Sequence, residues 1–406
     1  MLQAGSSKSF KTSSVLLPRE EMLETGRSFK SATIGIPKES SFKENRISLV
    51  PDAIAYLTAN GHTILVETNA GAAAGFKDQD LSEAGARIAY SKEDVYKADT
   101  ILKISPPTEE EIVLIQPGQT IISAIQLTNR CEGVIRGLMQ KKVNAIAFNY
   151  MKDSEGVFPV VRSMSEIAGS ASILIAAEYL SNATKGKGLI LGGISGVPPT
   201  NVVIIGAGTV GEFAARAALG LGAYVKVFDT SVHRLRRIQD QLGMRIYTCL
   251  ITPKDLAEAV KGADVVIGAL RAPEGRTPCV VSEQMVSEMK FGSVIIDVSI
   301  DQGGVFETSA PTDHANPTFS KFGVTHYCVP NIPSRVAHTA SMALSNIMGP
   351  LLLRMGEEGG LENTLKNDPG ARHGVYIFRG TLTNKHFGDM YKIPFTDLNL
   401  LSAAFS

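Results

Sequence analysis

Apolar residues in the first part of the chain gather in short continuous runs, and segments with helical periodicity separate these runs. The helical segments cover 52–60 and 132–142. Because strands that alternate with helices are typical of crossover units, the pattern predicts a mostly parallel sheet. We expect this first α/β domain to extend to about residue 163. Its predicted strands lie at 32–37, 63–67, 100–104, 120–124 and 143–148.

A second series of apolar runs begins after a glycine-rich stretch at 191–196. Helical patterns such as 210–220 and 253–260 lie between these runs. The runs contain continuous Val and Ile rather than alternating polar residues, which is typical of strands covered on both faces of a doubly wound sheet. The sequence therefore predicts a second parallel α/β domain. Its strands are expected at 202–205, 223–228, 264–269, 293–298 and 326–329.

Two longer apolar segments, 165–182 and 337–355, predict helices that bridge the domains. The second helix would return the chain to the first domain, and the aromatic tail beyond Gly359 is expected to pack on the body. The expected division is an N-terminal extension at 1–31, a first domain at 32–163 and 336–406, and a second domain at 164–335.

Composition narrows the class of protein. The 406 residues carry 40 basic and 40 acidic side chains, so no global basic field favours nucleic acid. An apolar fraction of 44% excludes wholesale disorder, and the short apolar runs argue against a membrane span. No CxxC or zinc spacing occurs, so we expect reduced thiols and no metal site. The cysteines are Cys131, Cys249, Cys279 and Cys328.

The N-terminal leader is rich in Ser and Lys and has one apolar patch, Val15-Leu16-Leu17. The patch is too short for the core of a signal peptide, and no small-residue cleavage site follows it. We therefore expect a solvated or partner-contacting arm and a cytoplasmic protein.

A glycine motif, GAGTVG at 206–211, lies between an apolar strand and a helical segment. Gly206 would allow a tight turn, Gly208 would let a pyrophosphate approach the backbone, and Gly211 would allow close packing of helix on strand. Asp229 ends the next strand, where it would accept ribose hydroxyls and repel a 2′-phosphate. The context predicts a Rossmann-like domain that binds NAD; a glycine-rich turn without a ligand is the alternative.

Several further segments, in matching order, resemble the alanine dehydrogenase and pyridine nucleotide transhydrogenase alpha-subunit family. The resemblance covers about residues 32–355, and it implies two Rossmann-like doubly wound α/β domains joined by long helices. The matching segments are GIPKE at 35–39, ENR at 44–46, LVP at 49–51, VETNAG at 66–71, MSEIAG at 164–169, GGISGVPP at 192–199, DVSIDQGG at 297–304 and HYCVPNIP at 326–333.

The resemblance implies that Arg46 and Lys103 bind a small-molecule substrate, whereas either residue alone could be a surface cation. A guanidinium suits two-point capture of an α-carboxylate. An ammonium beside a carbonyl can stabilise developing charge and help to move protons. Asp301 matches a carboxylate that could orient ribose, substrate or water, with helix capping as the alternative. Asn331 matches a position at the substrate and nicotinamide.

The resemblance also implies the residues that hold the cofactor. Ser165 and Ile332 match positions that line the nicotinamide pocket, and Arg234 could lie near the adenine or be a solvated helix charge. The expected cofactor contacts are Ser165, Gly206, Gly208, Thr209, Val210, Gly211, Asp229, Arg234 and Ile332.

One departure concerns the acid–base group. Alanine dehydrogenases carry a histidine just after the third strand, and this chain has Gln126 there. An amide has no proton that titrates near neutral pH, so Gln126 can bind but cannot act as a general acid or base. Proton transfer would fall to Lys103, Asp301 and water, or the reaction would be slower, or the substrate would differ.

The transhydrogenase branch also lacks this histidine, so Gln126 does not choose between the branches. The stretch FPVVRSMSE at 158–166 looks like the alanine dehydrogenase version. We therefore expect an NAD-dependent enzyme that interconverts L-alanine with pyruvate and ammonium, with the homo-oligomer (hexamer or dimer) that the resemblance implies. Two alternatives stay open: a soluble transhydrogenase-like component that needs a membrane partner, and a non-catalytic NAD-binding protein.

Overall fold

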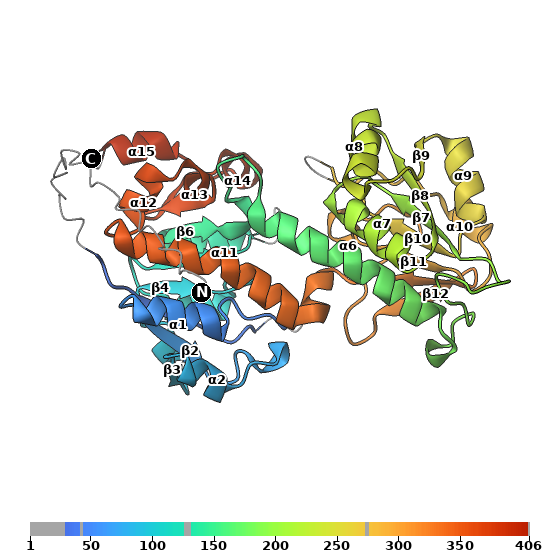
Figure 1. Cartoon of the computed structure of the whole chain (residues 1–406). Coiled ribbons are helices and arrows are strands. Elements are labelled where there is room, and N and C mark those ends of the chain that lie inside the picture. Colours follow the sequence, from blue (N-terminus) through green and yellow to red (C-terminus); the bar gives the residue numbers. More distant parts are fainter. Residues whose placement is uncertain (1–28, 41–43, 126–130, 273–275, 405–406) are drawn as a thin grey trace, which may run out of the picture.

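The computed structural model describes residues 29–40, 44–125, 131–272 and 276–404. Most of the expected N-terminal extension and the whole of Gln126 lie outside these residues. Two sheets, one built mainly from the first part of the chain and one from its middle, form the two bodies that Figure 1 shows side by side.

The first sheet has eight strands in the order β15-β14-β6-β5-β4-β1-β2-β3. Strands β1 to β6 are parallel, and numbered in order of appearance they follow 3-2-1-4-5-6 from β3 inward, the order of a doubly wound dinucleotide-binding sheet. The strands are β1 (Thr33–Ile36), β2 (Thr63–Glu67), β3 (Arg87–Ala89), β4 (Thr100–Leu102), β5 (Thr120–Ser123), β6 (Asn144–Ala147), β14 (Val375–Phe378) and β15 (Thr381–Leu382). The helices that precede α6 are α1 (Pro51–Ala59), α2 (Asp78–Glu83), α3 (Lys92–Val95), α4 (Glu109–Leu114) and α5 (Glu132–Gln140).

The second sheet has seven strands in the order β12-β13-β11-β10-β7-β8-β9, and it repeats the same doubly wound order from β9 to β13. Its central strands are wholly buried runs of Val and Ile, which confirms that the continuous apolar segments are strands covered on both faces. The strands are β7 (Asn201–Ile205), β8 (Tyr224–Asp229), β9 (Tyr247–Leu250), β10 (Val265–Gly268), β11 (Val294–Asp297), β12 (Thr318–Lys321) and β13 (Val324–Tyr327). The helices are α7 (Thr209–Gly220), α8 (Val232–Leu242), α9 (Pro253–Lys261) and α10 (Glu283–Ser287).

The two predicted long helices are present as α6 (Pro159–Leu180) and α11 (Ala337–Glu357). Figure 1 shows α6 running from the first body into the second, while α11 lies along the first. Helix α6 starts six residues earlier than predicted, at Pro159, whose ring suits the first helical position.

Length and apolar composition alone would let α6 and the segment Ile332–Glu357 cross a membrane. Helix α6 packs instead against α7 and α11 and gives Ile173 to the core of the second body. Helix α11 gives Leu344 and Met348 to the core of the first. This packing accounts for the apolar character of both helices.

The C-terminal tail packs on the first body, as predicted, and buries Tyr376, Phe378 and Phe387. Its two strands, β14 and β15, were not predicted; they extend the first sheet by antiparallel pairing beyond β6. Strand β14 is only four residues long and has no alternation, so its pattern resembles any short apolar segment. The helices of the tail are α12 (Leu361–Asn367), α13 (Pro369–His373), α14 (Lys385–Tyr391) and α15 (Leu398–Ala404).

Candidate active site

In each sheet the strand order reverses between two neighbouring parallel strands, β1 and β4 in the first and β7 and β10 in the second. Ligands of open α/β sheets bind outside the carboxyl ends of the strands at such a switch point. Glu39 and Lys103 follow β1 and β4, whereas Gly206 and Arg271 follow β7 and β10. Most of the predicted site residues therefore belong to these two edges.

Arg46 lies in an extended segment after β1, which three buried serines hold against the return helix. The hydroxyls of Ser334, Ser341 and Ser345 accept the backbone N–H groups of residues 45, 47 and 50 at 2.9, 2.9 and 3.0 Å. Ser334 precedes α11 in a short 3-10 helix (Ile332–Val336), and the other two serines lie on α11 itself. This serine ladder fixes the backbone from which Arg46 projects.

The Arg46 guanidinium is bound by Glu44. Nε and Nη2 of Arg46 each lie 2.7 Å from a carboxylate oxygen of Glu44, and Nη1 lies 3.1 Å from the sulfur of Met164. Burial raises the pKa of Glu44, but pairing with Arg46 outweighs burial and leaves this pKa below its usual value. A guanidinium has five N–H donors, so one hydrogen on Nη1 and one on Nη2 remain beyond these three contacts.

Asn331 meets the same carboxylate from the other side. Its side-chain amide donates to Glu44 Oε2 at 2.8 Å, and its backbone is left-handed, with φ of 61°. Asn331 and Arg46 thus bind the same carboxylate, although they are 285 residues apart in the sequence. Ile332 follows directly and is buried.

The Lys103 side chain is fully enclosed at the end of β4. Its ammonium lies 2.6 Å from Glu111 Oε2, 3.8 Å from Glu39 Oε2 and 3.5 Å from the carbonyl oxygen of Pro106. Burial raises the pKa of Glu39 despite the nearby ammonium. Burial also raises the pKa of Glu111, but there the Lys103 charge prevails and the net shift is downward.

Two further contacts tie the Arg46 and Lys103 segments together. The hydroxyl of Ser48 donates to the carbonyl of Leu102 at 3.2 Å, and the carboxylate of Glu39 accepts the backbone N–H groups of Ile104 and Ser105. Both predicted substrate cations are therefore anchored at one edge of the first sheet.

The glycine motif forms a tight turn between β7 and α7. Gly206 has φ of +118°, and a Cβ there would lie 2.4 Å from the carbonyl oxygen of Ala269, which directly follows β10 across the switch point. A Cβ on Gly211 would lie 1.8 Å from the carbonyl oxygen of Gly206, whereas one on Gly208 would meet nothing within 4 Å. The backbone at Gly208 therefore faces open space at the N-terminus of a twelve-residue helix, as a phosphate cradle requires.

Asp229 is fully buried at the end of β8, beside this turn. Its carboxylate accepts the backbone N–H groups of Ala207 at 2.7 Å and Ser231 at 2.8 Å. Arg234 Nη1 lies 3.9 Å away, and Arg237 donates to the carbonyl of Ala207 at 3.1 Å. Asp229 thus holds the backbone of the turn, and it lies at the position where the sequence predicts a ribose contact.

Ser165, Thr209 and Val210 lie where α6 crosses the beginning of α7. A Cβ on Gly169 of α6 would lie 2.4 Å from the carbonyl oxygen of Val210, so the two helices touch there. Ser165 is four residues before Gly169, on the same helical face one turn away. It therefore lies one helical turn from the contact between α6 and Val210.

Asp301 follows β11 and is accessible to solvent. The surrounding protein partly desolvates the Asp301 carboxylate and raises its pKa, and the positive charge of Arg271 opposes this rise. Burial likewise raises the pKa of Tyr150, in the first body, and the same Arg271 charge opposes that shift. Arg271 is thus close enough to both bodies to act on Asp301 and Tyr150.

Comparison with known proteins agrees with this geometry. Residues 35–168 match the model of the N-terminal domain of alanine dehydrogenase/PNT, and residues 172–385 match the model of its C-terminal domain. The chain belongs to the alanine dehydrogenase/PNT family.

Two relatives show how far the similarity extends. Alanine dehydrogenase 2 of Staphylococcus aureus (strain USA300) is 39% identical over 359 residues, which are 88% of this chain and 96% of the relative. A solved L-alanine dehydrogenase is 36% identical, with a TM-score of 0.84, and the match covers 89% of this chain and 99% of that one. The family and fold predicted from the sequence are confirmed.

A transhydrogenase from Sinorhizobium meliloti has the same fold, with a TM-score of 0.76 at 23% identity over 86% of this chain and 99% of the other. At that identity the likeness concerns the fold alone.

The buried histidines of this family member have partners elsewhere. His62 lies at the start of β2, at the opposite edge of the first sheet from Lys103, with its ring edge against Phe29. His326 lies within β13, where its Nε2 is 2.8 Å from the hydroxyl of Thr308. Both of these histidines therefore lie away from Lys103.

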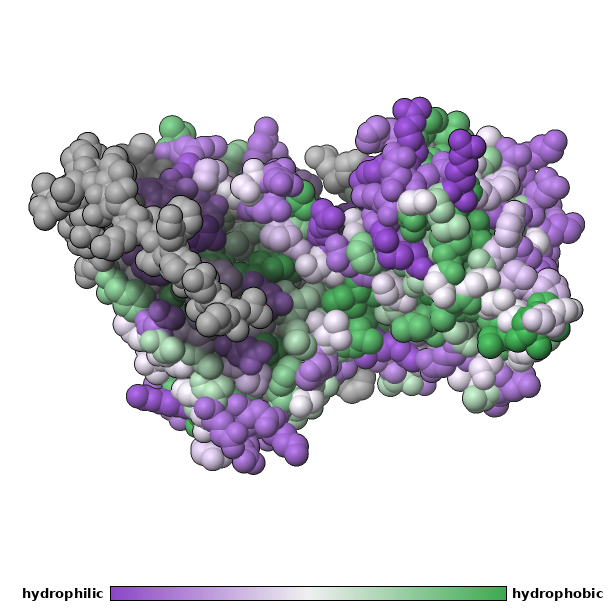
Figure 2. Space-filling view, in the orientation of Figure 1, coloured by the Kyte–Doolittle hydropathy of each residue, from purple (hydrophilic) through white to green (hydrophobic). Residues whose placement is uncertain are grey.

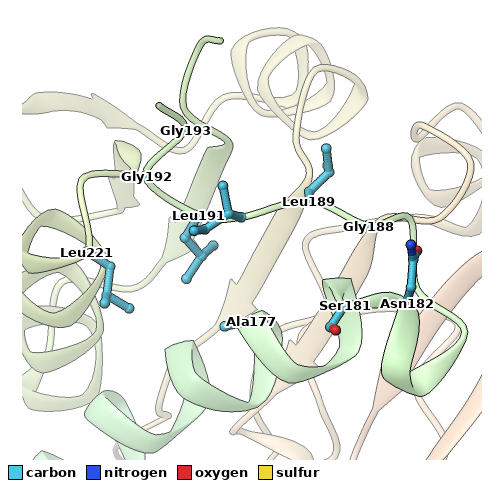
Figure 3. A pocket seen from close by; sticks show the side chains of 10 residues that line it. Ala177, Ser181, Asn182, Gly188, Leu189, Leu191, Gly192, Gly193 and Leu221 are labelled. Carbon is cyan, nitrogen blue, oxygen red and sulfur yellow. The ribbon is translucent and has the colours of Figure 1, made fainter. Parts of the chain in front are cut away.

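The pocket in Figure 3 is a separate feature. It lies between the C-terminal end of α6, the glycine-rich segment 188–193 and Leu221. Leu221 follows the C-terminal end of α7, whereas the glycine turn stands at the N-terminal end. The pocket therefore lies away from the nucleotide edge of the second sheet.

Glu44, Glu111 and Arg271 were not predicted as site residues. Glu44 belongs to the ENR segment at 44–46, and its position two residues before Arg46 was the signal in the sequence that the two side chains could pair. Glu111 is three residues after Thr108, a spacing typical of a helix capping box, which the structure contains. Sequence alone gave no signal that the same carboxylate binds Lys103.

Proposed function

We propose that this protein is an NAD-dependent alanine dehydrogenase, which oxidises L-alanine to pyruvate and ammonium and catalyses the reverse reaction. The observation that carries the proposal is the 39% identity to an alanine dehydrogenase over nearly the full length of both chains. The pairing of Arg46 and Lys103 at one sheet edge supports it, because an α-oxoacid needs a partner for its carboxylate and one for its carbonyl.

The residues present fit a dinucleotide. The open space at Gly208, the N-terminus of α7 and the buried Asp229 suit a pyrophosphate and an adenosine ribose. When bound, NAD accepts a hydride from the substrate Cα at its nicotinamide ring. In our proposal Ser165 and Ile332 line the nicotinamide, Thr209 and Val210 lie beneath the phosphates, and Arg234 lies near the adenine.

We assign the substrate carboxylate to the end-on donors of Arg46, and Asn331 to the same end of the substrate. Lys103 would face the substrate oxygen or nitrogen after a side-chain rotation, because its ammonium is enclosed in the described conformation. Asp301 would orient the ribose or a water from the second domain. Gln126 would bind without titrating.

The charges around this site favour a small zwitterion. Among the described residues, two cations, Arg46 and Lys103, are paired with three carboxylates, those of Glu44, Glu39 and Glu111. A substrate with a second carboxylate would add negative charge to carboxylates that are already buried, which is costly. Alanine brings one carboxylate and one ammonium.

The assembly and the compartment are part of the proposal. Figure 2 shows apolar surface over the part of the second domain where α6 and α7 lie. Leu174 and Leu221 are 59% and 46% exposed there, and Ile190 and Ile194 of the adjoining glycine-rich segment are 66% and 68% exposed. Such clustered exposure favours contact between copies of the chain, and we propose a cytoplasmic homo-oligomer.

The test is NADH consumption with pyruvate and ammonium, beside glyoxylate and other small oxoacids. We expect the highest kcat/KM with pyruvate. Turnover with none of these oxoacids would contradict the proposal, and nucleotide binding without turnover would instead support a non-catalytic NAD-binding protein.

A further inference from the structure

The buried ammonium of Lys103 connects to the surface through one carboxyl group. Oε2 of Glu111 accepts from Lys103 Nζ at 2.6 Å and from the backbone N–H of Thr108 at 3.0 Å. Its other oxygen, Oε1, lies 3.1 Å from both the hydroxyl of Ser40 and the ammonium of Lys92. The two oxygens of Glu111 thus face opposite directions.

The inner and outer ends of this series of contacts differ in their exposure to water. The Lys103 and Glu111 side chains are 0% and 2% exposed, but the Lys92 side chain is 26% exposed and Ser40 lies at the surface. An unbroken series of hydrogen-bond contacts therefore runs from a fully dry ammonium to solvent. An ammonium only donates, whereas a hydroxyl can also accept, so the Ser40 contact is the one through which a proton can leave Glu111.

The proposed reaction requires such a path. L-alanine, NAD⁺ and water give pyruvate, NADH, ammonium and one proton, so each oxidation must deliver a proton to solvent and each reduction must take one up. Gln126, an expected site residue, has an amide that cannot accept this proton. The proton must leave through another group.

We propose that Glu111 is the proton relay between Lys103 at the substrate and solvent at Ser40 and Lys92. In the described conformation an N–H bond of Lys103 breaks as an O–H bond forms on Glu111 Oε2, and Lys103 becomes a neutral amine. The amine then rotates to the substrate and takes a proton from it, which restores the ammonium. Rotation of the Glu111 carboxyl group brings its proton to the Ser40 side, where water takes it and leaves Glu111 ionised; no electrons change hands. This inference rests on the proposed function.

The surroundings of Glu111 suit a group that holds a proton only in transit. Lys103, directly after β4, and Lys92, on α3, place positive charge at its two oxygens. The Glu39 carboxylate lies 3.8 Å from the same Lys103 ammonium, and the Glu111 charge acts on the phenol of Tyr96. The two ammonium groups keep Glu111 ionised at rest. Its neighbour Glu39 accepts two backbone N–H groups and is not in the path to solvent.

The decisive variant is Glu111→Gln, because glutamine keeps the size and the capping-box acceptor but cannot carry a proton. We expect kcat for alanine oxidation to fall roughly 10²-fold, the usual worth of acid–base assistance, while calorimetric affinities for NADH and pyruvate stay nearly unchanged. The control is Lys97→Met, which removes an exposed lysine that lies just after α3 and pairs with Asp94. This variant should leave kcat unchanged.

A second variant separates relay from positioning. Glu111→Ala opens space for a small acid, so added formate should restore part of its kcat and shift the pH profile toward the pKa of formate. Restored activity is not expected if Glu111 merely holds Lys103 in place. If either Glu111 variant fails to fold, the double variant Ser40→Ala/Lys92→Met removes only the outer contacts and should lower kcat in the same direction.

The outcomes distinguish the two proposals. Wild-type protein without alanine turnover would refute the proposed function. Wild-type turnover with an unchanged kcat in Glu111→Gln, or with weaker pyruvate binding and no formate rescue, would refute the relay alone.

Discussion

Glu44 binds the Arg46 guanidinium with both of its carboxylate oxygens, each 2.7 Å from a guanidinium nitrogen. This side-on pairing fixes the plane of the guanidinium, and the sulfur of Met164 lies 3.1 Å from Nη1. An arginine that would otherwise have many rotamers is thereby preorganised for a planar anion.

The first prediction concerns this arginine. Arg46→Lys keeps the charge but loses the fork, so we expect the KM for pyruvate to rise about tenfold or more, with Arg46→Ala at least as severe. Steady-state kinetics at saturating NADH and ammonium measure the change. Arg136→Lys, an exposed arginine paired with Glu132, is the control. An unchanged KM in Arg46→Ala would refute the assigned role.

The glycine turn predicts opposite effects at two positions. Gly208→Ala adds a methyl group in open space, so the fold should persist while nucleotide affinity falls, since the methyl occupies the phosphate approach. Gly211→Ala places a methyl 1.8 Å from the carbonyl of Gly206, so the fold itself should be destabilised. Thermal unfolding and NADH fluorescence titration separate the effects. Equal melting temperatures for the two variants would contradict this reading.

Asp229 should control both the turn and the choice of nucleotide. Asp229→Asn loses one of the two acceptors that hold the N–H groups of Ala207 and Ser231, at a cost of about 1.5–3 kcal/mol of stability. It also removes the charge that repels a 2′-phosphate, so preference for NADH over NADPH should shrink. Urea denaturation and paired titrations with the two nucleotides measure these changes. A variant with undiminished preference would assign discrimination to another residue.

The stability of the protein should fall in mild acid because of its buried histidines. Burial lowers the pKa of His326 from its ordinary value of 6.5, although the carbonyl of Val324 opposes this. The unfolded chain therefore binds the proton more readily, so this contribution to stability is complete above pH 6.5 and is lost as the pH falls toward the folded pKa. Burial shifts His62 in the same direction.

His326→Gln should flatten this dependence, by at most about 1.4 kcal/mol per pH unit. Urea denaturation between about pH 5 and pH 7 measures the slope. His233→Gln, at an exposed position on α8, is the matched control. A slope in the His326 variant equal to that of wild type would show that this imidazole does not contribute.

Much of the fold could be predicted from the sequence because the relevant signals are local. The Val and Ile runs of β7, β10 and β11 and the apolar pattern of α6 follow from burial on one or both faces. Strand β14 could not be predicted, because its pairing with β6 depends on contacts between residues about 230 positions apart.

The candidate site likewise has one part that could be predicted from the sequence and one that could not. The glycine turn and Asp229 are specified by a motif whose spacing reflects backbone geometry, so the sequence was enough to suggest them. The partners of Lys103 and Arg46 could not be predicted. Glu111, which binds Lys103, fits a helix capping box equally well. Asn331, which contacts Glu44 beside Arg46, follows the whole second domain in the sequence.

The serine ladder has a consequence for biogenesis. During synthesis the arginine-bearing segment leaves the ribosome long before Ser341 and Ser345 exist, so its backbone N–H groups remain hydrated until α11 emerges. The second body can be complete while the first body still awaits α11 and the helices that follow it. A chain that ends before α11 would contain the glycine turn of the second body, while the Arg46 segment would lack the two serine hydroxyls of α11 that hold its backbone.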